Sequence, residues 1–397
     1  MTVPELDAFV SDARAWMSSM AAPRTQRPWG QGSDAVAVFE NWTEEEERAE
    51  TDRIRAYEQA KYDAGFGAIT WGPEHGGRAL PVSYLMAFRR AEAEYDVPRR
   101  TEMFPVTQQL IAPTIAQWGT EEQRSTYVRA MLRTDVIACQ LFSETEAGSD
   151  LAAVRTRAVR DGDGWRLDGH KVWTSGARVA DYGVAITRTD PGGAKHAGLT
   201  AFIVPMDAPG VTVRPIRQMT GGSSFNEVYL DGVHLDDAQR LGPEGAGWKV
   251  ALTVLASERL DSGSLGLENA DQAVELARHL DRPLTELERD AVADLVTRSY
   301  VQRLTGMRVA AAVVAGADAG PEASVGKLLA TDTMARTSEV VRLLLGPDLT
   351  VQGDRWGTWA WTEHVLGAPG YRIAGGTDEI QHNILAERVL GLPREPR

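Results

Sequence analysis

Apolar residues along the chain change their spacing twice, and these changes divide the sequence into three blocks. Over 43–134 they recur mainly at helical spacing, and Thr120 with Gln123 has the pattern of a capping box at a helix start. Over 136–242 they alternate in β-branched runs, with Asp-Gly pairs at hairpin positions. Helical spacing then returns. The pattern predicts an α+β protein whose elements run in the order α, β, α.

No repeat, low-complexity tract or long linker separates the blocks. A chain of 397 residues with 43% hydrophobic content is long enough to bury more than one core. We therefore expect three domains: a helical domain over 1–135, a β domain over 136–242 and a second helical domain over 243–397.

Charge and composition argue against several classes of partner. A formal net charge of -14 argues against nucleic acid and anionic membranes. Cys139 is the single cysteine and the 7 histidines lack ligand spacing, so we expect no intrachain disulfide and no metal site. No segment has a signal-peptide pattern or approaches the roughly 20 apolar residues of a membrane span. The expected protein is soluble and cytoplasmic.

Two loops of the β block have the composition of a site for a flat, polar ligand. The stretch FSETEAGSD, 142–150, offers hydroxyls, a glycine and free backbone amides. An ordinary Ser/Gly-rich connection would have the same composition. The stretch HKVWTSGA, 170–177, offers the broad face of Trp173 and, on the same side of a strand, the hydroxyl of Ser175. The alternative there is a core tryptophan with an outward serine.

A third candidate is the turn IAGGTDEIQ, 373–381. Thr377 can cap a helix whose positive end Asp378 and Glu379 favour. A helix start needs only one permissive residue, so the capping role leaves the glycine pair unexplained. Two adjacent glycines let the backbone approach a ligand closely.

The longer stretches CQLFSETEAGSDLA, KVWTSGA and AGGTDEIQHNILAERVLGLPRE closely resemble the signatures of the FAD-dependent acyl-CoA dehydrogenase family. They occur in the family's order, and the resemblance extends over nearly the whole chain. It implies an N-terminal α-helical domain, a central antiparallel β domain and a C-terminal four-helix bundle. It also implies FAD as cofactor and an oligomer, either a homotetramer or a hetero-oligomer, with FAD at the subunit contacts.

The resemblance assigns a role to each matching position. Trp173 would pack on the flavin, and Ser175 would reach its N5 edge. The N–H of Gly375 would help to hold the thioester carbonyl of the substrate, and Gly376 would allow the close approach. The remaining contacts of the cofactor would come from Phe142, Ser143, Gly148, Ser149, Arg278, Gly346, Thr377 and Glu379, and those of the substrate from Ser149 and Arg259.

One departure from the family pattern bears directly on the chemistry. Many members carry the catalytic glutamate where this chain has Gly375, which cannot take a proton. We expect Glu258 to replace it, as in isovaleryl- and long-chain-type members, because it interrupts an apolar stripe of Val250 and Val254 and has no cationic neighbour three or four residues away. Such a carboxylate should have a raised pKa and act as a base. The alternative is an ion pair with an arginine of another helix or subunit.

Two further departures concern segments near the family's subunit contacts. RHLDRP keeps Arg278, but Asp281 and Arg282 replace the family's Phe and Gly, and RLLLG keeps only Gly346. These changes weaken the expected contacts to the adenosine side of FAD.

We therefore expect an enzyme that α,β-dehydrogenates an acyl thioester, carried on CoA or on an acyl carrier protein. Glu258 would be the base, Gly375 part of the carbonyl clamp, FAD the hydride acceptor and an electron-transfer flavoprotein the next acceptor. Two alternatives stay open. One is a flavin oxidase or monooxygenase on the same fold, and the other is a non-catalytic partner subunit of a hetero-oligomeric acyl-CoA dehydrogenase.

Overall fold

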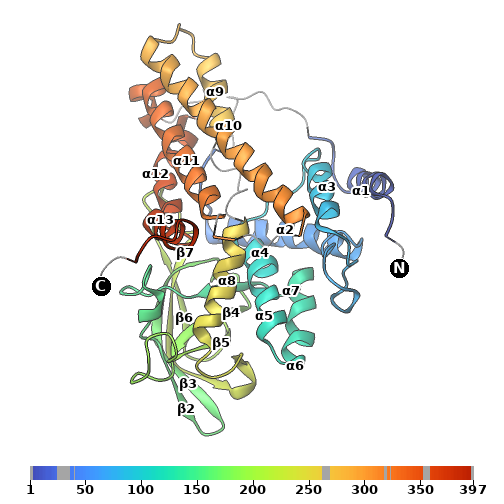
Figure 1. Ribbon diagram of the computed structural model, residues 1–397, viewed down its shortest axis with the longest axis vertical. Coiled ribbons are helices and arrows are strands. Elements are labelled where there is room, and N and C mark those ends of the chain that lie inside the picture. The colour runs from blue at the N-terminus through green and yellow to red at the C-terminus, as the bar shows by residue number, and fades with distance from the viewer. Residues whose placement is uncertain are drawn as a thin grey trace. The chain divides into compact units, whose positions relative to one another are not determined.

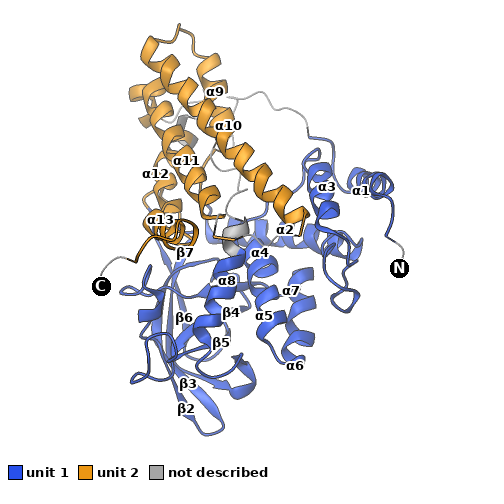
Figure 2. Cartoon of the chain, in the orientation of Figure 1, with its two compact units in different colours: residues 1–25, 42–218, 223–257 blue, residues 26–41, 219–222, 258–397 orange. Residues whose placement is uncertain are grey.

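The computed structural model describes residues 3–24, 36–39, 41–261, 269–316, 320–321, 323–351 and 358–394, with side chains except at 258–261 and 358–360. The chain divides into two compact units (Figure 2): unit 1 comprises residues 1–25, 42–218 and 223–257, and unit 2 comprises residues 26–41, 219–222 and 258–397. No helix within the described ranges is long and apolar enough to cross a membrane.

The first part of unit 1 is helical (Figure 1). The helices are α1 (Leu6–Met20), α2 (Glu44–Asp63), α3 (Val82–Glu92), α4 (Met103–Pro105), α5 (Ala112–Trp118), α6 (Glu121–Gln123) and α7 (Arg129–Arg133), with π-helical segments at Val106–Ile111 and Arg124–Val128. The Thr120 side chain accepts from the N–H of Gln123 at the start of α6, and the Gln123 side chain accepts from the N–H of Thr120. The predicted capping box is therefore confirmed. Thr43 and Glu46 form a second capping box at the start of α2.

The middle of unit 1 is an 8-stranded sheet in the order β6-β7-β3-β2-β4-β5-β8, with β1 paired to β4 off this path. The strands are β1 (Ala138–Leu141), β2 (Arg157–Asp161), β3 (Gly164–Ser175), β4 (Tyr182–Arg188), β5 (Leu199–Pro205), β6 (Val211–Ile216), β7 (Phe225–Asp236) and β8 (Arg240–Leu241). The main ladders are antiparallel, as predicted. β1 departs from that prediction and pairs in parallel with β4, because a long connection through β2 and β3 joins the two strands.

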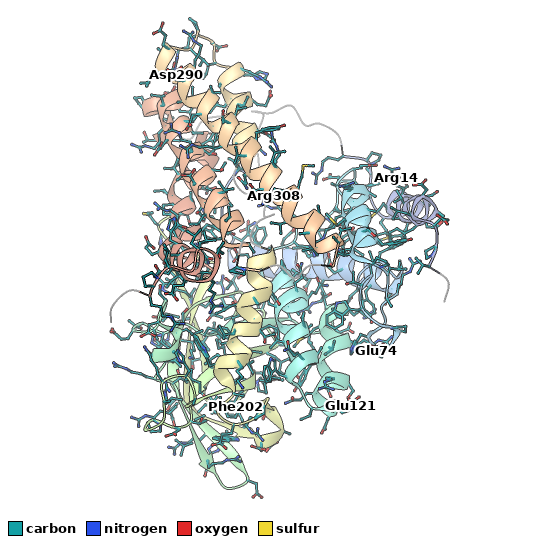
Figure 3. All side chains as sticks on the ribbon, viewed as in Figure 1. Arg14, Glu74, Glu121, Phe202, Asp290 and Arg308 are labelled. Atoms are coloured by element: carbon teal, nitrogen blue, oxygen red, sulfur yellow. The ribbon has the colours of Figure 1, made fainter. Side chains whose placement is uncertain are left out.

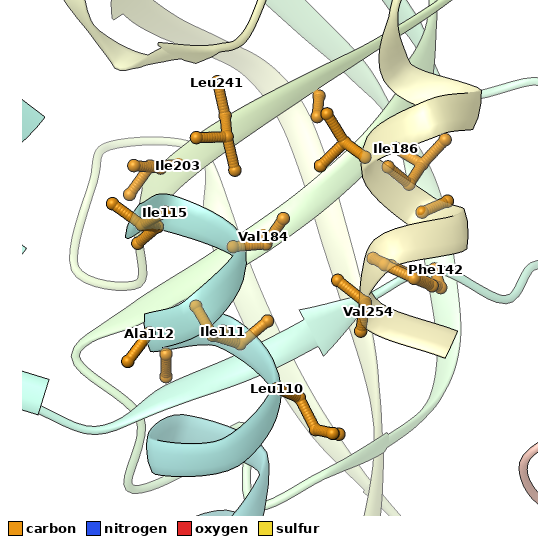
Figure 4. Close-up of a cluster of buried hydrophobic side chains, with 14 of the residues drawn as sticks. Leu110, Ile111, Ala112, Ile115, Phe142, Val184, Ile186, Ile203, Leu241 and Val254 are labelled. Carbon is orange, nitrogen blue, oxygen red and sulfur yellow. The ribbon is translucent and has the colours of Figure 1, made fainter. Parts of the chain in front are cut away.

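Strands β4 and β5 have a hydrophobic core on each face. Both are buried over consecutive residues, which explains their unbroken apolar runs. On one face, Val184 packs with Ile115 of α5 and Val254 of α8 (Gly247–Asp261), as Figure 4 shows. On the other face, Phe202 meets Trp165 edge to face with ring centroids 5.1 Å apart. The sheet is therefore a rigid support for the loops at its ends.

Unit 2 is helical. Its helices are α9 (Ala270–Arg278), α10 (Glu286–Val314), α11 (Ala323–Leu345), α12 (Thr358–Tyr371) and α13 (Asp378–Ile384), with a 3-10 turn at Gly346–Thr350 and a π-helical segment at Leu385–Val389. Val36, Leu276, Leu295, Val341 and Trp361 belong to its core. A helical N-terminal region, an antiparallel-rich sheet and a helical C-terminal region thus follow one another, as predicted.

Candidate functional site

Trp173 lies at an irregular step of the sheet. Between Lys171 and Thr174, β3 has one residue more than the segment of β7 between their partners Val228 and Asn226. Such a β-bulge re-aims side chains. Trp173 has a φ of +60 there, a left-handed conformation that is an outlier for a bulky residue, and it is 59% exposed. The core-tryptophan alternative is therefore wrong, and Trp173 presents its ring outside the sheet core.

A buried ion pair fastens the loop 142–150 to the strand that carries Trp173. Nζ of Lys171 donates to the Glu144 carboxylate at 2.7 Å and to two main-chain carbonyls, that of Phe142 at 3.1 Å and one on β4 at 2.7 Å. Burial lowers the pKa of Lys171 to about 8, against the attraction of Glu144, so the ammonium is charged at neutral pH. Burial also opposes ionisation of Glu144, but the Lys171 charge and hydrogen-bond donors lower the pKa of that carboxyl overall.

The loop 142–150 offers backbone and hydroxyl groups to a ligand. The side chain of Phe142 is buried in the core of Figure 4, so it is not available to line a site. The hydroxyls of Ser143 and Ser149 have no hydrogen-bond partner in the part of the chain that the structure describes. Gly148 is exposed, and a Cβ there would meet no atom within 4 Å. The loop therefore offers two hydroxyl donors and, at Gly148, room for a close approach.

Gln140 and Ser175 flank this loop. Nε2 of Gln140, at the end of β1, is buried and has no hydrogen-bond partner among the described residues. Buried amide donors are nearly always bonded, so this one indicates an acceptor beyond the described residues, for which a ligand is a candidate. The hydroxyl of Ser175 donates to the carboxylate of Glu102 at 3.2 Å. Its predicted contact with a flavin edge would compete with that bond.

The two glycines of the C-terminal turn have left-handed backbones, with φ of +63 at Gly375 and +89 at Gly376. A Cβ at Gly376 would lie 3.0 Å from Nε2 of Gln381, so both conformation and space favour glycine. Gln381 donates to the carbonyl of Gly375 at 2.9 Å, and Nζ of Lys327 donates to that of Gly376 at 2.7 Å. No acceptor within the described ranges takes the N–H of either glycine. The turn leaves two backbone donors for a ligand.

A buried carboxylate anchors the same turn. Asp378 accepts from Nε of Arg372 at 2.7 Å and from the hydroxyl of Thr331 at 3.0 Å, and it lies 3.4 Å from Nζ of Lys327. Burial opposes its ionisation, but these groups lower its pKa below the usual value. Thr377 caps the start of α13, as predicted. The turn is thus held by residues of α11 and α13 and by Arg372, which follows α12.

The predicted base lies near the C-terminal end of α8. Glu258 and Arg259 belong to this helix, and their side chains lie outside the described residues. Val250 and Val254, which precede Glu258 on the predicted stripe, are fully buried, so the stripe itself is confirmed that far. Glu379, a predicted cofactor contact, is exposed on α13.

The predicted adenosine-side residues have partners or positions within unit 2. Arg278 forms an exposed ion pair with Glu275 of its own helix, α9. Arg282, which replaces the family's glycine, donates to both carboxylate oxygens of Glu288 at 2.9 and 2.7 Å. It therefore ties the segment after α9 to the start of α10. Gly346 ends α11 in a left-handed conformation, with a φ of +54.

Sequence reasoning misses Lys171, Lys327 and Gln381. Lys171 carries a usable signal, because it follows Trp165 and Leu167 at alternate positions and so falls on the buried face of a strand. A lysine at such a position indicates a buried partner. Lys327 carries no local signal, since the carbonyl that it binds lies 49 residues away in the sequence.

Family models match most of the chain. The N-terminal, middle and C-terminal domains of acyl-CoA dehydrogenase match residues 33–135, 139–233 and 245–390. The chain is similar to the acyl-CoA dehydrogenase IpdE1 of Mycobacterium tuberculosis, with 34% identity over 402 residues that cover 99% of each chain. Among solved structures it is similar to the Tcur3481-Tcur3483 steroid ACAD, with 26% identity, a TM-score of 0.78 and 100% of both chains covered. It is also similar to the ChsE4-ChsE5 complex from Mycobacterium tuberculosis, with 25% identity, a TM-score of 0.76 and coverage of 100% of this chain and 99% of that one.

Proposed function

Since this chain belongs to the acyl-CoA dehydrogenase family, we propose that it α,β-dehydrogenates an acyl thioester with FAD as the hydride acceptor. In this reaction a C=C bond forms beside the thioester, the α-hydrogen leaves as a proton and the β-hydrogen as a hydride. The observation that supports a bound flavin is the conformation of Trp173. Its ring is exposed, and its backbone is strained at a β-bulge. Strain of this kind clusters at functional sites.

The residues around Trp173 fit a bound FAD. A flat ring can stack on the exposed face of Trp173. The hydroxyls of Ser143 and Ser149 and the buried Nε2 of Gln140, which have no partner among the described residues, can donate to its polar edge. When bound, FAD would supply the acceptor for the β-hydrogen. Further cofactor contacts that we propose from the resemblance are the main chain of Phe142, Gly148, Ser175, Arg278, Gly346, Thr377 and Glu379.

In this proposal the residues that activate the substrate differ from those that bind the flavin. Negative charge grows on the thioester oxygen as the α-proton leaves. The N–H groups of Gly375 and Gly376, which have no acceptor among the described residues, would stabilise it. The carboxylate of Glu258 takes the α-proton. Ser149 and Arg259 are the further substrate contacts that the resemblance proposes.

Replacing the proposed base tests this assignment. Glu258→Gln keeps the volume of the side chain but removes its basicity, so flavin content and acyl-CoA binding should persist while flavin reduction slows by at least about 10²-fold. Asp261→Asn, on the same helix, is the matched control and should leave the rate unchanged. Stopped-flow absorbance after anaerobic mixing with acyl-CoA measures both. Full activity in Glu258→Gln would reject Glu258 as the base.

We further propose that another chain of the same family covers α10. This helix has 29 residues, yet Glu288 and Leu295 are the two that are buried. Figure 3 shows the side chains along it, with Asp290 and Arg308 labelled. Its exposed large apolar residues are Leu287, Val296, Tyr300, Val301, Leu304, Met307 and Val314. Helices are stabilised mainly by packing an apolar face, and exposed apolar stretches mark interaction sites.

The names of two similar structures bear on the kind of partner and substrate. The Tcur3481-Tcur3483 steroid ACAD and the ChsE4-ChsE5 complex are each named for two proteins. We therefore favour a homologous partner chain over a homotetramer, and keep a subunit role in a hetero-oligomeric enzyme as the second candidate function. Because one of these structures is named a steroid ACAD, a steroid-derived acyl-CoA should be among the substrates tested. CoA and an acyl carrier protein both stay open as the carrier of the thioester, and an electron-transfer flavoprotein as acceptor remains a prediction from the resemblance.

A further inference from the structure

Trp173 occupies a backbone position that favours glycine. Left-handed residues at β-bulges are commonly glycine, because a Cβ is unfavourable in that conformation. Burial cannot offset the strain at Trp173, which is 59% exposed. Its ring contact with Phe225 is edge-on, with centroids 6.0 Å apart. The conformation must therefore be held by groups that act on the neighbouring backbone.

Lys171 fixes the chain two residues before Trp173. Its fully buried ammonium donates to Glu144 and to two main-chain carbonyls, one in the adjoining loop and one on β4. The next residue, Val172, donates its N–H to the carbonyl of Ser143 at 2.9 Å. This part of β3 is thus bonded to the loop that carries the proposed flavin contacts.

Asn226 fixes the chain one residue after Trp173. It lies on β7 directly opposite Thr174, and it is fully buried. Its Nδ2 donates to the carbonyl of Thr174 at 3.0 Å. A side-chain amide that bonds the facing strand adds a hydrogen bond beside the bulge, where the ladder is disrupted. The chain is therefore held on both sides of Trp173, at Lys171 and Val172 before it and at Thr174 after it.

We infer that Lys171 and Asn226 are positioning residues that hold Trp173 in its left-handed, outward conformation and so prepare its ring to receive the flavin. The inference rests on the proposed function, because it takes the flavin as the ligand of Trp173. Both residues act through the backbone and not by contact with the cofactor. A binding surface that is ordered before the ligand arrives loses less freedom on binding.

The alternative is that Lys171 and Asn226 only stabilise the sheet. A second buried lysine serves as a matched control that distinguishes this alternative from a positioning role. Lys61 on α2 is also buried, and it pairs with Glu58 at 2.5 Å and Glu92 at 3.2 Å. We expect Lys171→Met and Lys61→Met both to lower the unfolding temperature. Lys171→Met alone should raise the FAD dissociation constant, by at least about tenfold, because the ring is no longer preorganised. It should also change the visible circular dichroism of the bound flavin.

Asn226→Leu provides an independent second variant. It removes the donor at similar volume, so it should weaken FAD binding as Lys171→Met does, and it decides the test if Lys171→Met does not fold. An equal loss of FAD affinity in Lys61→Met would overturn the inference, because removal of any buried lysine would then have the same effect.

A readout without flavin separates this inference from the proposed function. Biosynthetic 5-fluorotryptophan gives Trp173 a ¹⁹F resonance in the apoprotein, which Trp173→Phe assigns. The resonance should shift or broaden in Lys171→Met and Asn226→Leu, and stay unchanged in Lys61→Met. If the wild type binds no FAD, the proposed function fails while this resonance still tests the positioning. An unchanged resonance in both Lys171→Met and Asn226→Leu would overturn the inference.

Discussion

Backbone strain at a single residue, Trp173, links stability to binding. Trp173→Gly removes the ring and relieves the left-handed backbone, whereas Trp173→Ala removes the ring and keeps a Cβ there. Both variants should lose flavin retention. The Trp173→Gly apoprotein should nevertheless be about 1 kcal/mol more stable than the Trp173→Ala apoprotein, since the strain is gone. Urea unfolding of the two apoproteins measures the difference, and an alanine variant of equal or greater stability would contradict the argument.

The burial of His364 should make the stability of the folded protein depend on pH. His364 is fully buried, and burial lowers its pKa to about 4 despite hydrogen bonds to the carbonyls of Met334 and Val36. The unfolded chain binds this proton below about pH 6.5 and the folded chain only below about pH 4. The folded state is therefore favoured above pH 6.5, and its stability falls as the pH drops toward 4, by up to about 3 kcal/mol.

A neutral replacement isolates this contribution. His364→Gln should lose this part of the pH dependence, so the difference in unfolding free energy between the two proteins should change between about pH 7 and pH 4.5. Chemical unfolding at several pH values measures it. A difference that stays constant over this range would show that His364 does not titrate as described.

At the scale of elements, α10 carries the prediction on assembly. Leu304→Asp places a charge in its exposed apolar stretch, where Leu304 is 45% exposed, and should weaken association with the partner chain by at least about tenfold. Val159→Asp on β2 is the control, because Val159 is 49% exposed but far from α10 in the sequence. Sedimentation velocity of the chain, alone and co-expressed with a homologous acyl-CoA dehydrogenase chain, measures assembly. Assemblies that tolerate Leu304→Asp would exclude this surface.

Elements with local signals are the ones that the sequence predicts well. The capping box of Thr120 and Gln123 and the cap at Thr377 are correct, because donor and acceptor lie three residues apart. The bulge at Trp173 is not predictable in this way. It arises from the register with β7, whose paired residues lie about 50 positions further along the chain, as the separation of 52 between Asn226 and Thr174 shows.

At the scale of the whole molecule, the change of hydrophobic period predicts the order of helical and β regions but not which unit an element joins. The helical pattern after residue 243 is correct, yet Val250 and Val254 of α8 pack in the core of unit 1. Periodicity reports the type of an element, whereas packing partners decide its unit. The domain boundaries at 135 and 242 remain predictions. So do the site roles, since composition indicated the loops without fixing how their side chains are held.

We expect this chain, loaded with FAD, to oxidise an acyl thioester. Anaerobic titration with acyl-CoAs tests this expectation. The purified protein, alone and with a homologous partner chain, is titrated with straight-chain, branched and steroid-derived acyl-CoAs. The flavin absorbance and the thioester product are recorded together. We predict that at least one acyl-CoA bleaches the flavin and yields the 2-enoyl thioester in equal amount, and that oxygen restores the flavin only slowly. Rapid restoration by oxygen would favour the oxidase alternative. A protein that takes up no flavin in either setting, or whose flavin no acyl-CoA bleaches, would contradict the account.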